Sequence, residues 1–334
     1  MKKFLTLFLS LIVCILVIGG TACYEPQKDA VNVKYYATPA DISPLILAGN
    51  ETIGLIPEPA ATALQNEALK QGKTLYRMDL QEHYDSQEKA YPQAVLMVKK
   101  SVINAHEGLA QNLEQKIAQS VDWAKENPAS AVTAIGNNGA TTLKAPALTN
   151  DVIDACKIYW QSADNAKQSV KAYINNIIEI DSTKANQVND DFFYTPSAST
   201  NQKQQYTFIA PDGAPAIAIS KLMNDSDNLN TGKPISYSIV VADTIQSEVA
   251  SGQADFVLAP VNLASKLYKA HDSVDHYVMV AVITHGNFYI ISDSPLTIDD
   301  LQGKQVAVPM KGAVPDWTFQ MVLKKNNIPF VVVK

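Results

Sequence analysis

A strand that runs into a glycine turn and then a helix occurs twice in this chain of 334 residues. The first copy, YTFIAPDGAPAIAIS, covers residues 206–220, and the second, QVAVPMKGAVPDWTF, covers residues 305–319. Such a unit usually opens an α/β domain, because the helix packs back on the sheet to which the strand belongs. A chain of this length exceeds the usual single-domain size, so two lobes are expected, and 47% apolar residues are ample for two cores.

The two copies continue differently along the chain. After the first, strand and helix alternate to residue 260, which predicts a parallel sheet flanked by helices. After the second, the chain stops at residue 334, and the matching strand, helix and strand stand at residues 31–59. There Pro57 follows Gly49 by eight residues, as Pro260 follows Gly252. The two halves thus match only when the chain is read as a circle.

Spacing along that circle supports a circular permutation. Gly213 and Pro260 are 47 residues apart, and Gly312 and Pro57 are 56 apart when residue 334 is joined to residue 24. The polar segment 194–205, rich in Ser, Thr, Asn and Gln, then reads as a surface linker between the usual termini. Termini of compact domains often lie close together, so such a joint costs little.

Two apolar stripes between these units predict helices. Leu109, Leu113, Ile117 and Val121 recur every four residues in a helix that ends before residues 127–128. A further helix carries five apolar residues, namely Val170, Tyr173, Ile174, Ile177 and Ile178. Both stripes are assigned to packing against the lobe that begins at residue 206.

The N-terminus has the layout of a secretory signal peptide, with two lysines, an apolar run over residues 4–18 and small residues before Cys23. Residues 20–23 also resemble a bacterial lipobox, although Gly20 stands where Leu is usual. We expect Cys23 to carry the lipid; the alternative is soluble secretion with Cys23 incidental. Without residues 1–23, and with Cys23 lipidated, Cys156 is the only free thiol and no intrachain disulfide can form.

Charge and motifs exclude several function classes. Without Lys2 and Lys3 the chain has 25 basic and 33 acidic residues, which argues against nucleic-acid binding. The single arginine, Arg77, lies in the strand-like TLYRMDL and is expected at a solvated strand position; the alternative is a ligand clamp. No nucleophile elbow, zinc-protease motif, P-loop or metal-ligand spacing occurs, so an enzyme is not expected.

Several segments together carry a family resemblance: the lipobox-like signal, APDGAP, VASGQADFVLAP, LTIDDLQGKQVAVPMKGAVPD, LILAGNETIGLIPEP and NLEQKIAQSVDWAKENP. The chain resembles the substrate-binding proteins of ABC importers, nearest to the group for nitrate, sulfonates and thiamine-pyrimidine precursors. The resemblance implies a two-lobed α/β periplasmic-binding-protein fold of type II, with a mostly parallel sheet in each lobe and ligand in the cleft. The order of the halves departs from the family, in which the APDGAP lobe comes first.

The resemblance and the permutation together give a domain map. The expected parts are the signal peptide 1–23, the second part of lobe 2 at 24–95, a hinge return with helices packing on lobe 1 at 96–193, the linker 194–205, lobe 1 at 206–295, and a hinge with the first part of lobe 2 at 296–334. The two crossings between lobes are expected near residues 291–302 and 91–102.

The ligand site should lie beyond the carboxyl ends of the parallel strands. Glycine lets the backbone approach a ligand there, and N–H groups of the following helix point at it. The expected contacts are Asp212, Gly213, Ala214, Pro260, Asn262, Thr284, His285 and Asn287 from the first lobe, and Glu58, Gly312, Ala313 and Asp316 from the second. Each glycine turn, taken alone, is also explained as a plain chain reversal, and His285 as a structural hydrogen-bonding residue.

The ligand itself stays open at this level. Two helix N-termini favour a small anion such as a sulfonate. Glu58, His285, Asn287 and the aromatic residues Tyr35, Tyr36, Phe288 and Trp317 instead suit a flat heterocycle with amino groups, toward which we lean.

The resemblance implies an exported, lipid-anchored monomer on the outer face of the bacterial cell membrane that delivers its ligand to an ABC permease, without a cofactor. The alternatives are a lipoprotein sensor without a transport role and an enzyme that resembles the thiamine-pyrimidine synthase on a related fold.

Overall fold

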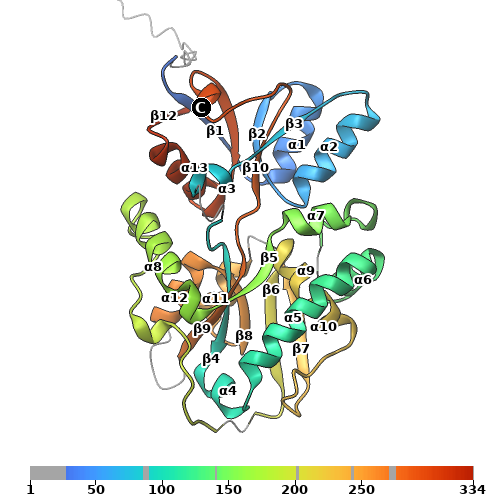
Figure 1. Ribbon diagram of the computed structural model, residues 1–334, viewed down its shortest axis with the longest axis vertical. Helices are drawn as coiled ribbons and strands as arrows, with labels where there is room; N and C mark the ends of the chain where they lie inside the picture. The colour runs from blue at the N-terminus through green and yellow to red at the C-terminus, as the bar shows by residue number, and fades with distance from the viewer. Residues whose placement is uncertain are drawn as a thin grey trace, which may run out of the picture.

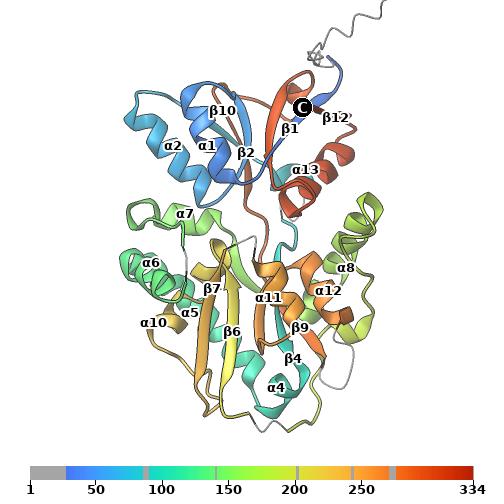
Figure 2. The same cartoon turned by 180° about the vertical axis from the view of Figure 1, so that it is seen from behind.

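The computed structural model describes residues 28–85, 90–139, 141–200, 203–241, 244–270 and 276–333. The expected signal peptide and Cys23 lie outside these ranges. Within them the chain forms two α/β lobes stacked along the long axis of the molecule, each built on a six-stranded sheet (Figures 1 and 2). Among the described residues no helix combines the length and apolar character that a bilayer span requires.

Lobe 2 is built from both ends of the chain. Its elements are β1 (Val31–Tyr36), α1 (Pro39–Ala48), β2 (Ile53–Pro57), α2 (Ala60–Lys70), β3 (Tyr76–Asp79), α3 (Gln81–Tyr84), β10 (Phe288–Ser292), η3 (Asp299–Leu301), β11 (Gln305–Pro309), α13 (Val314–Lys325) and β12 (Phe330–Val333). The strand order is β12-β1-β11-β2-β10-β3. The glycine turn after β11 thus opens a helix of this lobe.

Lobe 1 takes the middle of the chain. Its elements are β4 (Ala94–Lys99), α4 (Lys100–Ala105), α5 (Leu109–Glu126), α6 (Pro128–Asn137), η1 (Ala145–Ala147), α7 (Asn150–Ala155), β5 (Ile158–Ser162), α8 (Ala163–Ile180), η2 (Asp190–Phe192), β6 (Tyr206–Pro211), α9 (Ala214–Ala218), α10 (Ser220–Asn224), β7 (Ile235–Val240), α11 (Ile245–Ser251), β8 (Phe256–Pro260), α12 (Val261–Ala270) and β9 (Tyr277–Thr284). The strand order is β5-β9-β4-β8-β6-β7.

The sheets are mixed where mostly parallel sheets were expected. In lobe 1, β7, β6 and β8 are parallel, and β4 then pairs antiparallel with both β8 and β9. In lobe 2, β1, β11 and β2 are parallel, and β10 pairs antiparallel with both β2 and β3. In each lobe the antiparallel strand among these five is the one that arrives directly from the other lobe, and β5 of lobe 1 also pairs antiparallel, with β9. The two sheets therefore share one five-strand pattern, to which β5 and β12 are added at an edge.

The described chain crosses between the lobes twice. The first crossing joins β3 to β4 and contains α3, and the second joins β9 to β10. Because β10 belongs to lobe 2, the second crossing lies at residues 285–287, ahead of the expected 291–302. The two crossings touch at Gly286, where a Cβ atom would come within 2.6 Å of the Tyr91 ring. A φ of 79° also favours glycine at this position.

Three hydrophobic clusters of buried residues form the cores of the two lobes. One runs through both and includes Val33 and Leu55 of lobe 2 and Val95 of lobe 1. A second lies on the other face of the lobe 1 sheet, where α5 buries Leu113 and Ile117 against α9 and α10. The third lies under α1 and α2. Both stripes predicted from sequence are helical, but α8 contacts α13 of lobe 2 as well as α12 of lobe 1.

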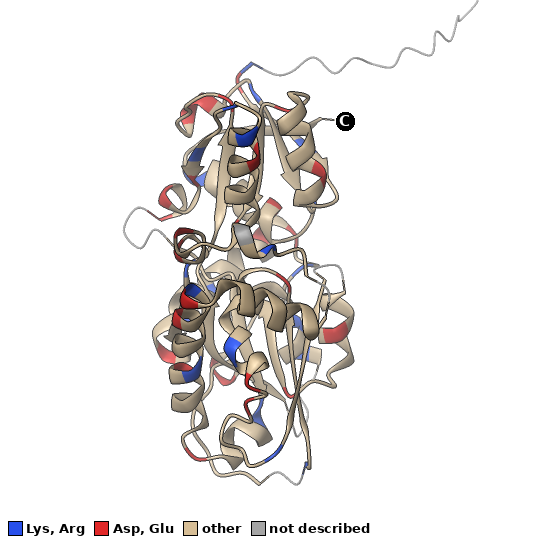
Figure 3. Cartoon of the chain, turned by 90° about the vertical axis from the view of Figure 1, so that its right-hand side faces the viewer, with Lys and Arg blue, Asp and Glu red and all other residues tan. Residues whose placement is uncertain are grey.

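The linker region crosses the base of lobe 1. Its described residues, 194–200 and 203–205, form no helix or strand. Lys203 pairs at 2.6 Å with Asp255, a carboxylate that is almost fully buried, and the backbone N–H of Ser197 donates to Asn104 Oδ1. Acidic and basic side chains are interspersed over both lobes (Figure 3).

Candidate ligand cleft

At the cleft the two sheets face each other end to end, so that the ends of their strands form two facing edges. On the lobe 1 side lie the ends of β9, β8 and β6 and the start of β4, which carry His285, Asn262, Gly213 and Gln93. On the lobe 2 side lie the ends of β2 and β11 and the start of β10. The site expected from sequence is therefore spread along these facing edges.

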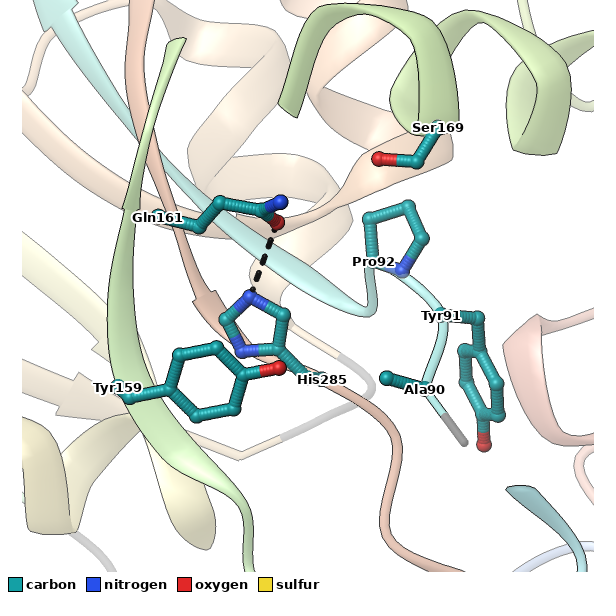
Figure 4. A pocket seen from close by; sticks show the side chains of 7 residues that line it. All are labelled: Ala90, Tyr91, Pro92, Tyr159, Gln161, Ser169 and His285. Carbon is teal, nitrogen blue, oxygen red and sulfur yellow. Dashed lines mark hydrogen bonds between the residues drawn. The ribbon is translucent and has the colours of Figure 1, made fainter. Parts of the chain in front are cut away.

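A pocket of about 260 Å³ opens beside the crossings on the α8 face of the lobe 1 sheet. Its lining residues are Ala90, Tyr91, Pro92, Tyr159, Gln161, Ser169 and His285. In Figure 4 the ring of Tyr159 lies over that of His285. Gln161, which is on β5 like Tyr159, lies beside them, and Ser169 lies on α8 above. Of these residues, sequence reasoning identified only His285.

His285 is held on three sides. Its ring stacks on Tyr159 with centroids 3.6 Å apart and planes 6° apart, and its Nε2 lies 3.3 Å from Gln161 Oε1. The backbone N–H donates to Lys157 O. Burial lowers the pKa of the imidazole from 6.5 to about 4, against the opposing effect of the Lys157 hydrogen bond. His285 is therefore neutral at pH 7.

Buried polar atoms without a partner gather at the same edges. Six such side-chain atoms occur in the described part of the chain, and four of them belong to Gln93, Asn262, His285 and Asn287. Native proteins leave few buried polar groups unsatisfied, because each costs about 1–3 kcal/mol. Their concentration along one cleft is typical of a site that a ligand completes.

Both glycine turns use their N–H groups internally. Gly213 donates to Asp212 Oδ1, and Gly312 donates to Asp316 Oδ2. Gly213 has φ 99° and ψ −144°, a region essentially restricted to glycine. The backbone itself therefore requires this glycine, and a β-branched substitution would strain the turn as well as obstruct a ligand.

The three expected carboxylates already have partners. Asp212 accepts hydrogen bonds from Thr141 and Thr142. Asp316 accepts from Tyr35 and Gln320. These two groups order the turns at the cleft.

Glu58 pairs at 2.8 Å with Arg77 and accepts from the N–H and hydroxyl of Thr62. Arg77 also lies over the Tyr289 ring, 3.7 Å from its centroid. Arg77 is exposed on the edge strand β3, as expected from its sequence, and the neighbouring strands also bring a buried carboxylate and a ring to its guanidinium.

The other expected site residues lie as follows. Thr284 accepts from Ala94 N, Ala313 donates to Met310 O, Ala214 is buried and Pro260 ends β8. Among the expected aromatic residues, Phe288 and Trp317 are buried in the core, and Tyr36 donates to Glu51.

Contacts between the lobes close the cleft at both ends. Asp79 of β3 pairs with Lys157 at 3.0 Å, and Tyr289 donates to Ala155 O. On the α8 side, the hydroxyls of Tyr173 and Thr318 lie 2.7 Å apart. In the described residues no cluster of three acidic, His or Cys side chains is arranged to bind a metal ion.

Comparison with known proteins gives distant similarities. No protein-family model and no curated protein matches the sequence. The oligopeptide-binding protein AppA from Bacillus subtilis, in complex with a nonapeptide, is 9% identical with a TM-score of 0.27, over 79% of this chain and 57% of that one. NikA from Brucella suis, in complex with Fe(III)-EDTA, is 10% identical with a TM-score of 0.29, over 80% and 58%.

NikZ from Campylobacter jejuni, in complex with Ni(L-His), is 10% identical with a TM-score of 0.31, over 85% of this chain and 59% of that one. The chain thus spans less than two thirds of the length of these three proteins. At this level of similarity, its function has to be argued from its own residues.

Proposed function

We propose that this protein is an extracytoplasmic solute-binding protein that captures a small molecule between its lobes and delivers it to an ABC importer permease. The observation that carries the proposal is the set of four buried, unpartnered polar atoms along the facing edges of the two sheets. A ligand between the lobes would satisfy them, and each satisfied atom would favour the closed arrangement.

The connection between the lobes supports this function. The described parts of the two crossings meet at Gly286, whose positive φ and lack of a side chain suit a hinge position. The pocket beside the hinge is lined by residues of both crossings. A ligand there would contact the segments whose angles change when the lobes open.

Export and anchoring are proposed from the sequence of residues 1–23. The apolar run, the small residues and Cys23 are those of a lipoprotein signal. Lipidation at Cys23 would hold the protein beside a permease on the outer face of the cell membrane. Residues 24–30 would then connect the anchor to β1.

The circular permutation is also part of the proposal. In lobe 1 the chain visits the central strand β6, the outer strand β7, β8 and β9, and then crosses to β10. Lobe 2 follows the same order from β11 through β1, β2 and β3, and then crosses to β4, if the two ends of the chain are joined. The additional strand β12 is consistent with the longer path, 56 residues against 47, between the corresponding positions.

A thermal-shift screen tests ligand capture. The protein from residue 24 onward is unfolded, refolded to release bound solutes, and mixed with sulfonates, nitrate, pyrimidines, flavins and a bacterial metabolite extract. A ligand at 100 times its dissociation constant stabilises the fold by about 2.7 kcal/mol. Delivery is then tested by uptake of that ligand in cells that lack the gene.

A matched pair of variants locates the binding site. Ser169→Trp fills the pocket and should abolish the shift. Ser247→Trp, at an exposed helix serine with the same hydrogen bond to the carbonyl three residues earlier, should keep it. Melting temperatures that respond to none of these samples would show that the protein does not capture a solute.

A further inference from the structure

We infer that the captured solute is an uncharged or cationic molecule rich in N–H or O–H donors, and not an anion. This inference rests on the proposed function and specifies its ligand. It follows from the chemical identity of the unpartnered atoms at the cleft and from the occupancy of the donors there.

All four unpartnered atoms are acceptors. The amide of Asn262 donates through Nδ2 to Lys184 O, and that of Asn287 donates through Nδ2 to Glu58 O, so in each the remaining atom is Oδ1. His285 donates through Nε2 to Gln161, which leaves the lone pair on Nδ1. The fourth atom is Gln93 Oε1. Such atoms accept only from a hydrogen-bond donor, so the group of the ligand that contacts them has to be an N–H or O–H.

These side chains are also strongly buried. Asn262, His285 and Asn287 are exposed by 6%, 2% and 3%. In the described residues the two other unpartnered atoms, Asn112 Nδ2 and His276 Nε2, lie on α5 and just before β9, away from the facing edges. Acceptors are therefore concentrated where the lobes meet.

Most of the donors that would receive an anion are already in use. Gly213 and Gly312 donate their N–H groups to aspartates, so an anion would have to displace a carboxylate at each turn. Arg77 is paired with Glu58 and Lys157 with Asp79. The exceptions are Lys184, whose side chain lies beside Gly312, and Lys311, which lies over the Tyr35 ring, and the test below therefore includes anions.

The test uses two pools of a bacterial metabolite extract, separated on a strong anion exchanger at pH 8. One pool is the flow-through, which contains neutral and cationic molecules, and the other is the retained anionic fraction. We expect the refolded protein to melt at a higher temperature with the flow-through and at an unchanged temperature with the anionic pool. A shift caused by the anionic pool overturns the inference and leaves the proposed function standing. No shift with either pool overturns both.

Variants then test the acceptors themselves. Asn262→Leu, Asn287→Leu and His285→Phe each remove an unpartnered atom, and the last keeps the ring on Tyr159. Each should lower affinity for the active compound by about tenfold or more, because one hydrogen bond is lost. The control Asn112→Leu removes an unpartnered atom outside the cleft and should leave affinity unchanged.

Stability separates a binding role from a structural one. Each variant also removes a made hydrogen bond, to Lys184 O, Glu58 O or Gln161 Oε1, which lowers the stability of the unliganded protein. A purely structural role would lower the melting temperature and leave the affinity of the folded protein unchanged, whereas a binding role lowers the affinity of the folded protein as well. Folding of each variant is checked by circular dichroism. Wild-type affinity in all three folded cleft variants overturns the assignment of these acceptors.

Discussion

His285 shows how one side chain at the cleft depends on its surroundings. The ring is covered by Tyr159 and bonded to Gln161, and Lys157, whose carbonyl accepts the His285 N–H, is paired with Asp79. Burial is the main cause of its pKa of about 4. A protonated imidazole is thus disfavoured in the folded protein at any pH above that value.

This arrangement predicts a pH dependence of stability. The unfolded chain binds a proton at this histidine below pH 6.5, whereas the folded protein does so only near pH 4. Because the unfolded state holds more protons between these values, the unfolding free energy falls as the pH drops through this window. The loss of unfolding free energy caused by this histidine approaches about 3 kcal/mol at pH 4. Above pH 7 its titration does not change the unfolding free energy.

Urea unfolding of the wild type and of His285→Gln at pH 7, 6, 5 and 4 measures this contribution. The variant should lose less stability than the wild type over the same range, because glutamine does not titrate. Parallel losses in both proteins would show that the imidazole is not shielded as the structure implies.

Arg77 shows what sequence patterns cannot reveal about a residue. Alternation in TLYRMDL placed it on a strand, and β3 does include it. Its partner Glu58 directly follows β2 and its partner Tyr289 lies on β10, more than 200 residues away in sequence. A pairing between distant strands is set by tertiary packing, which local periodicity does not encode.

At the scale of elements, local patterns predicted much of the fold. The helices α5 and α8, the glycine turns and the parallel strands after them follow from periodicity and turn chemistry. The places of β4 and β10 were not predicted, since both are buried apolar strands whose sheet is decided by the crossings. The pocket residues Tyr159 and Gln161 were missed because β5 carries no turn or glycine signal.

The order of the elements leads to a prediction about a rearranged chain. A protein in which residues 206–334 precede residues 24–195 should form the same two sheets, because β12 and β1 are neighbours in one sheet. It should bind the same ligand with similar affinity. Circular dichroism, hydrogen exchange of β6 and β11, and calorimetric titration provide the comparison. A rearranged protein that is folded but does not bind would argue against the permutation.

At the scale of the whole molecule, Cys156 can report on lobe separation. It is buried at the end of α7, and its pKa is raised by burial first and then by Glu58 of lobe 2. Its neighbour Ala155 packs against the lobe 2 cluster under α1 and α2 and accepts a hydrogen bond from Tyr289. Separation of the lobes would remove part of this cover.

We expect Asp79→Asn to increase the rate at which Cys156 reacts with a thiol reagent, because it removes the ion pair with Lys157 between the lobes. A partly exposed ion pair stabilises the closed arrangement by up to about 1 kcal/mol. Its loss would raise the population of molecules with separated lobes by up to roughly fivefold. Asp190→Asn breaks ion pairs inside lobe 1 and is the control. Equal rates of Cys156 modification in the two variants would mean that the ion pair between Asp79 and Lys157 does not hold the cleft closed. The captured solute should slow the reaction in both variants.

The path of the linker has a consequence for a chain that is cut. If the backbone is cleaved within 194–205, the first piece keeps β1 to β5 and the second keeps β6 to β12, so each piece holds strands of both sheets and neither holds a complete sheet. The pieces would be interlocked partners, and their stability would depend on concentration as in a heterodimer. Two halves expressed separately would form the cleft only when they associate. Ligand binding would therefore report that both pieces are present and assembled.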